Sequence, residues 1–225
     1  MLAFLKYQRY KAKHKPQFLI PYFFYILFIV FVYSYSGAES LSSYTLTSIG
    51  LFAISVWLGI QNSKSELLNE KYIVLIQLTR ASTYVIGKLI FIITLNLPLI
   101  FIALIYPLIF NKFIPTASLN EVLLGLYAHI SAIILGTLIG SFALVPKIKH
   151  LKYLYLMAFL LIVLTILKPV FINLYPFTKY VLWILPTLPD LEGSAVQLLF
   201  STVTISFYSF IIFLILVYLF KHSEE

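Results

Sequence analysis

The chain has 225 residues, of which 61% are hydrophobic and only 11% are charged, and its formal net charge is +8. Soluble domains carry about 25% charged residues, so this composition excludes an ordinary water-exposed surface. Cysteine is absent, which excludes both a disulfide framework and a thiolate metal site.

Taken in chain order, the elements begin with residues 1–15, which mix apolar and basic side chains ahead of Pro16 and predict a short amphipathic helix at the membrane interface. Six segments nearly free of charge follow, and each meets or approaches the roughly 20 apolar residues that a membrane-spanning helix needs. These segments are 18–35, 44–61, 89–110, 121–145, 153–174 and 196–220. The sequence therefore predicts an all-α polytopic membrane protein with six transmembrane helices in a single domain, residues 1–225.

The basic residues predict the orientation of these spans. Of the 16 Lys and Arg residues, 13 lie before the first span, between the second and third, between the fourth and fifth, or after the sixth. The positive-inside rule then places both termini in the cytoplasm. We expect a multi-pass protein of a bacterial plasma membrane, whose basic N-terminus contacts anionic lipid rather than nucleic acid.

The connection before the last span, residues 168–195, is apolar and contains four prolines. It is too apolar for a free aqueous loop and too short and broken for a full span. We therefore expect extracellular re-entrant or interfacial half-helices, with Tyr175, Tyr180 and Trp183 near the lipid headgroups.

Between the second and third spans, residues 62–88 combine charged side chains with an apolar run, 73–76, that is too short to cross a bilayer. On a helical wheel of residues 66–80, polar side chains form one stripe in which Ile73 is the only apolar member. The stripe contains Glu66, Asn69, Glu70, Gln77 and Arg80. This pattern predicts an amphipathic cytoplasmic helix under the membrane, and a merely solvated face is the plain alternative.

The order of these elements resembles the permease subunits of type-2 ATP-binding-cassette exporters: two spans, an acidic segment, then LTRASTYVIGK running into the third span. The matching positions are Glu66 or Glu70, residues 75–78, residues 79–82, and Gly87 with Lys88. The chain departs from the family at one point, where Arg80 stands in place of a common proline. The resemblance implies a coupling helix that contacts cytoplasmic ATPase subunits, and a second permease copy or a homologous permease as a further partner. The implied contact residues are Glu66, Asn69, Glu70, Lys71, Gln77 and Arg80.

Nucleotide chemistry is not expected on this chain. Gly87-Lys88 lacks the phosphate-loop glycine five residues earlier, where Ser82 stands, and Leu89 replaces the required Ser or Thr. We expect no catalytic residue, metal or cofactor here, with ATP and Mg on the partner subunit. By analogy the cargo is amphipathic or hydrophobic, with an antimicrobial peptide favoured. The alternatives are a non-transporting immunity or structural membrane protein and, less favoured because no acid lies mid-span, an intramembrane enzyme.

Two further features lie within the predicted spans. Small residues four apart, Ala128, Ala132, Gly136 and Gly140, predict close helix packing within the subunit or at a dimer seam. Asn96 and His129 are polar residues in apolar surroundings and mark a possible substrate path; a helix kink near Asn96 and an interhelical hydrogen bond from His129 are the plainer alternatives.

Overall fold

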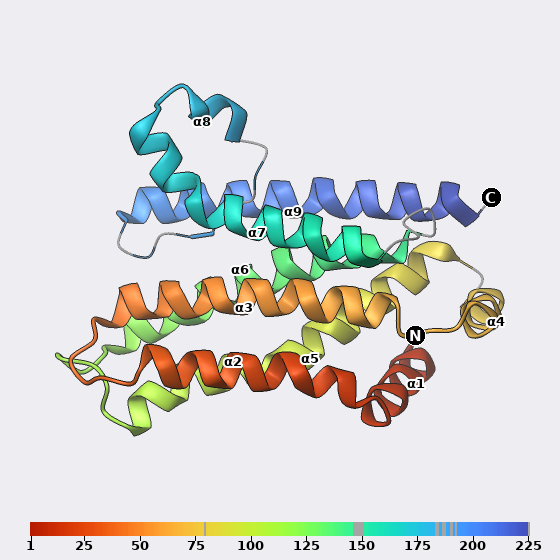
Figure 1. Cartoon of the computed structure of the whole chain (residues 1–225), viewed down its shortest axis with the longest axis horizontal. Helices are drawn as coiled ribbons and strands as arrows, with labels where there is room; N and C mark the ends of the chain where they lie inside the picture. The colour runs from red at the N-terminus through yellow and green to blue at the C-terminus, as the bar shows by residue number, and fades with distance from the viewer. Residues whose placement is uncertain are drawn as a thin grey trace.

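A computed structural model of the chain describes residues 1–225 except 79, 146–150, 183–184, 186–187, 190, 192 and 225. The described residues form helices and no strands (Figure 1), which confirms the all-α prediction. In chain order the helices are α1 (Leu2–Lys13), η1 (Pro16–Phe18), α2 (Leu19–Val32), α3 (Ser40–Ser63), α4 (Leu68–Leu78), α5 (Ala81–Ile109), α6 (Leu119–Gly140), η2 (Ser141–Leu144), α7 (Leu151–Leu174), α8 (Thr178–Val181) and α9 (Ala195–Glu224).

The lengths and hydropathy of these helices indicate a membrane protein. Within the described residues, four helices are long and apolar enough to cross a membrane: Ser40–Ser63, Ala81–Ile109, Leu119–Leu144 and Val196–His222. A fifth candidate is the pair Leu2–Lys13 and Pro16–Val32, which is bent by 87°. The 24-residue α7 is not in this set.

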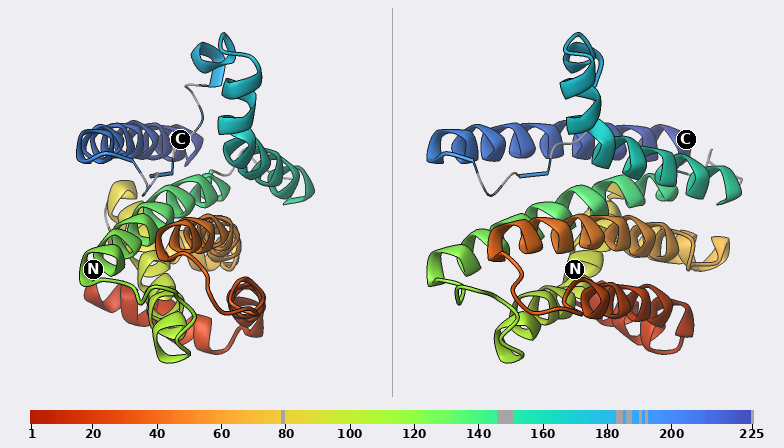
Figure 2. Two further views of the ribbon diagram at one scale, coloured as in Figure 1. Left: turned by 90° about the vertical axis from the view of Figure 1, so that its left-hand side faces the viewer. Right: turned by 60° about the vertical axis from the view of Figure 1, so that its left-hand side comes forward.

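The long helices α2, α3, α5, α6, α7 and α9 run alongside one another, while α1 and α4 lie at one end of the bundle (Figures 1 and 2). Both chain termini lie at this same end (Figure 1). At the opposite end, the loops after α2 and α5 meet at a bridge between Ala38 and Phe113. Gly37 there has φ +92°, a conformation that favours glycine, and its N–H donates to the Lys112 carbonyl at 3.0 Å.

Helix α3 is the central element, because it contacts α2, α5, α6 and α7. Its many hydroxyl groups are tolerated in the interior because they bond to the helix's own backbone: Ser55 donates to the Leu51 carbonyl at 2.7 Å. These internal hydrogen bonds allow the hydroxyl groups of α3 to be buried. The small size of the Ser and Thr side chains allows neighbouring helices to pack closely against α3.

The small-residue stripe of α6 packs against α3 of the same chain. A Cβ atom on Gly140 would lie 2.3 Å from the Val56 carbonyl oxygen, and one on Gly136 would lie 2.6 Å from that of Phe52. Ala128 and Ala132 are fully buried in the same interior. The stripe therefore occupies an interface within the subunit, and its four members are not free to form a dimer seam.

The described part of segment 168–195 contains the end of α7 and one short helix. After α7 ends at Leu174, its described residues contain one helix of four residues, α8, which projects away from the bundle (Figure 2). Thr178 closes this turn by donating to the Tyr175 carbonyl at 2.7 Å, while Tyr175 and Tyr180 are exposed. Trp183 lies outside the described residues.

Candidate functional site

Helix α4 is the candidate site, and it is shorter than the predicted helix over residues 66–80. It spans Leu68–Leu78, with Glu66 ahead of its first turn. The N–H of Leu67 donates to a Glu70 carboxylate oxygen at 3.2 Å and so satisfies a backbone group at the start of the helix. Arg80 has an extended backbone and forms the N-cap of α5, so α4 and α5 are separate helices.

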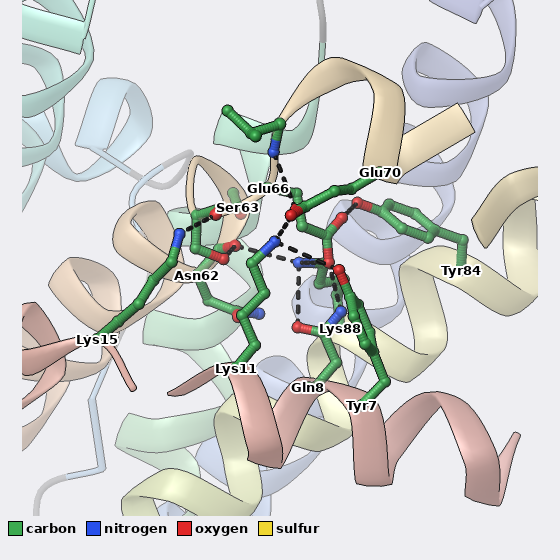
Figure 3. Close-up of polar contacts among 12 residues, drawn as sticks. Tyr7, Gln8, Lys11, Lys15, Asn62, Ser63, Glu66, Glu70, Tyr84 and Lys88 are labelled. Carbon is green, nitrogen blue, oxygen red and sulfur yellow. Dashed lines mark hydrogen bonds and ion pairs between the residues drawn. The ribbon is translucent and has the colours of Figure 1, made fainter. Parts of the chain in front are cut away.

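A buried ion pair fixes the segment that leads into α4. The Glu66 carboxylate lies 2.6 Å from Lys88 Nζ of α5, and their side chains are 2% and 0% exposed. Lys88 also donates to the Gln8 side-chain oxygen and to the Asn62 carbonyl, each at 3.2 Å. Glu66 in turn accepts hydrogen bonds from Gln8 and from the Tyr84 hydroxyl (Figure 3). One network thus joins α1, the end of α3, the α3–α4 connection and α5.

The electrostatics of Glu66 follow from these contacts. Burial raises the pKa of its carboxyl group, but the charge of Lys88 and the hydrogen bonds from Lys88, Tyr84 and Gln8 outweigh burial and lower it below 4.5. Glu66 is therefore ionised at neutral pH. A buried charge pair is tolerated only when both partners are hydrogen-bonded, and this network meets that condition.

A second set of contacts holds α4 against α1. Lys11 forms an ion pair with Glu70, and Lys15 donates to the Ser65 carbonyl (Figure 3). The hydrogen bond from Lys11 lowers the pKa of the Glu70 carboxyl group. Both lysines come from the basic N-terminal segment, so part of its charge serves to position α4.

On its other side α4 is attached to the last helix. Lys71 Nζ lies 4.8 Å from the centroid of the Phe220 ring of α9, a cation–π contact. The inner face of α4, formed by Val74, Leu75 and Leu78, packs on an apolar cluster that includes Phe4, Tyr84, Leu89, Leu144, Leu216 and Phe220. This cluster draws its members from α1, α5, η2 and α9, so α4 rests on several bundle helices at once.

The outer face of α4 is more apolar than the sequence predicted. Tyr72, Ile73 and Ile76 are 55%, 58% and 78% exposed, and they are flanked by the exposed Asn69 and Gln77. Beside this face, a groove of about 590 Å³ lies between α1 and α4, with Ile73 and Gln77 among its lining residues. The exposed surface is therefore an apolar centre with a polar margin.

The predicted contact residues fall into three groups. Asn69, Gln77 and Arg80 are exposed, whereas Glu70 and Lys71 are engaged with α1 and α9. The Glu66 side chain, by contrast, is only 2% exposed and is paired with Lys88 inside the protein. Sequence reasoning missed Tyr72 and Ile76. Their signal was present on the wheel, where both lie within about 60° of Asn69 at 100° per residue.

The two polar residues of the suggested substrate path are buried. Asn96 accepts from Ser55 Oγ at 3.0 Å and donates to the Ile92 carbonyl at 2.9 Å. His129 Nε2 lies 3.2 Å from Thr47 Oγ1, and its Nδ1 lies 2.7 Å from the Gly125 carbonyl. Both side chains are 0% exposed, and each forms a hydrogen bond to α3. In this structure both residues therefore form hydrogen bonds between helices.

Comparisons of this chain with protein-family models, curated proteins and solved structures found no match.

Proposed function

We propose that this chain is the permease subunit of an ATP-driven exporter, with a cytoplasmic ATPase docked on the outer face of α4. The observation that carries the proposal is a short helix at one end of the bundle, exposed on an apolar face and firmly attached on the other. In this proposal ATP and Mg are bound by the partner, and the cargo is an amphipathic or hydrophobic molecule such as an antimicrobial peptide.

The outer face has the composition of a docking surface. Interfaces have a desolvated centre rich in aromatic and large apolar side chains, surrounded by polar residues that exclude water and select the partner. Tyr72, Ile73 and Ile76 supply such a centre, and Asn69 and Gln77 supply the margin. Arg80 is exposed just beyond the helix and adds a charge whose complement on the partner would favour correct pairing.

The inner face suits the transmission of motion. Nucleotide binding can change the bundle only if it favours one arrangement of the helices over another. The Glu66–Lys88 pair connects the segment that leads into α4 to α5, the Lys11–Glu70 pair connects α4 to α1, and Lys71 connects α4 to α9. A displacement of α4 by its partner would therefore act on three helices directly.

The topology of the proposal has six spans: α2, α3, α5, α6 with η2, α7 and α9. The end that carries α1, α4 and both termini is rich in Lys and Arg, which supports its placement in the cytoplasm. The outer faces of α7 and α9 expose large apolar side chains such as Phe159, Phe200 and Phe207. Lipid and a second permease copy would cover them.

The test is to purify the tagged chain from its native membrane and to measure bound ATP-hydrolysing activity. Ile73→Asp/Ile76→Asp should remove that activity while the protein remains monodisperse, because two charges would then lie in the docking centre. The matched control is Leu2→Asp, since Leu2 of α1 is exposed to the same 78% as Ile76. Retention of full activity by the α4 variant, or equal loss in the control, would contradict the docking role.

A further inference from the structure

A second groove, of about 470 Å³, lies between α1, α2 and α5 and is separate from the docking face of α4. Its lining joins two kinds of side chain. Arg9 and Lys13 of α1 are cationic, whereas Phe18, Tyr22, Phe91 and Leu95 are apolar or aromatic. The Tyr22 hydroxyl donates to the Leu95 carbonyl, so the apolar wall is held together across α2 and α5.

The cations of α1 fall into two sets. Lys11 and Lys15 are used inside the protein, on Glu70 and on the Ser65 carbonyl. Arg9 and Lys13 are one helical turn apart and exposed, and across the described part of the chain neither has an ion-pair partner. Two unpaired positive charges therefore stand beside an apolar wall.

The shape of the groove follows from the bend between α1 and the helix after it. Leu2–Lys13 and Pro16–Val32 meet at 87°, so cations on the first helix lie at the end of the apolar side of the second. Leu19 lines the groove on that side, and Phe23 lies one helical turn further along α2; their side chains are 67% and 60% exposed. A ligand that follows this surface has an anionic head and a long apolar tail.

We propose that this groove binds one anionic phospholipid from the surrounding membrane. Its phosphate would lie on Arg9 and Lys13, at the level where polybasic segments attract acidic headgroups. One acyl chain would lie along Leu19 and Phe23. A free phosphate anion would leave the apolar wall unused, so the surface fits a membrane lipid, and the inference does not depend on the ATPase partner.

Occupancy would also position α1 for the site already described. Arg9 lies next to Gln8, which donates to Glu66, and Lys13 lies two residues from Lys11, which pairs with Glu70. A lipid held on the outer side of α1 would therefore favour the arrangement in which α1 clamps the start of α4.

The experiment uses the full chain in mixed phosphatidylglycerol and phosphatidylcholine nanodiscs, followed by native mass spectrometry after transfer to detergent. The wild-type protein should retain one phosphatidylglycerol in preference to phosphatidylcholine. Arg9→Gln/Lys13→Gln should weaken that retention roughly thirty-fold, given the attraction expected of two basic residues at a membrane surface. Lys6→Gln/Lys221→Gln removes two exposed cations from the two termini, which lie at the same end of the bundle as the groove's cations, and should leave retention unchanged.

A second variant separates a formed groove from diffuse surface charge. Ala12→Phe fills the groove without changing the net charge, so it should also reduce retention, with monodispersity in pure phosphatidylcholine showing that it folds. Equal retention by Arg9→Gln/Lys13→Gln and wild type would overturn the site. The site would also be overturned if the Lys6/Lys221 control lost as much phosphatidylglycerol retention as the groove variant, or if Ala12→Phe left retention unchanged. Displacement of the lipid by soluble glycerol phosphate would overturn it as well.

Discussion

Replacing Lys88 with Met tests the buried network most severely. Met has nearly the length of the Lys stem but no charge, so the change leaves the Glu66 carboxylate buried at 2% exposure without its counter-ion. Removing one partner of a buried ion pair costs about 3–5 kcal/mol, because the remaining charge has lost its compensation. In a domain of this size, that cost corresponds to a lowering of the unfolding midpoint by roughly 6–20 °C.

A double-mutant cycle separates the pair from the individual side chains. Glu66→Gln retains an amide oxygen for Lys88 and should cost less than Lys88→Met. The double variant Glu66→Gln/Lys88→Met has no buried charge and should recover much of the stability that Lys88→Met alone loses. The assay is thermal unfolding in detergent, followed by tryptophan fluorescence. The reasoning is refuted if Lys88→Met unfolds within about 2 °C of the wild type, or if the two single effects simply add.

Three further predictions follow from the same contacts. Because the pKa of Glu66 is lowered in the folded protein, the unfolded state binds more protons in acid, and stability should fall as the pH drops below about 5 and through the folded pKa. Glu66→Gln should flatten this pH dependence of stability. An unchanged pH profile in that variant would contradict the assignment. Gly140→Ala should destabilise by about 1–3 kcal/mol because the new Cβ meets the Val56 backbone. Gly50→Ala should cost less in the same unfolding assay, because the atoms nearest to its new Cβ belong to the movable Phe28 ring. Asn96→Ala should cost about 0.6 kcal/mol by removing the bond from Ser55 and should leave transport intact; a change in substrate selectivity would return Asn96 to the substrate path.

Much of the fold could be predicted from the sequence because long apolar segments have few structural alternatives. A helix satisfies its own backbone hydrogen bonds in an apolar environment, so residues 44–61 and 121–145 predicted α3 and α6 closely. The stripe from Ala128 to Gly140 predicted close packing for the same reason, since only small residues allow two backbones to approach. The local structure of residues 168–195 was more difficult to predict. Their four prolines disfavour a long continuous helix but do not specify which local structure forms instead.

The candidate site was predicted in position and only partly in detail. Charge within residues 62–88 indicated a helix outside the apolar spans, and α4 is there. The wheel could not show that Glu66 turns inward, since that depends on Lys88 and Tyr84, which are 22 and 18 residues away in the sequence. Nor could it show which side of α4 is covered, because the apolar cluster beneath it comes from distant helices.

The most direct test of the docking claim is the reactivity of a single cysteine at Gln77, an exposed residue of α4 in a chain that has no other cysteine. The measurement is the rate of labelling by a membrane-impermeant maleimide in inside-out vesicles, before and after peripheral proteins are stripped. The account predicts slow labelling while the ATPase is bound, faster labelling after stripping, and slow labelling again when the purified ATPase is returned. Equal rates in all three states, or labelling from outside intact cells, would contradict it.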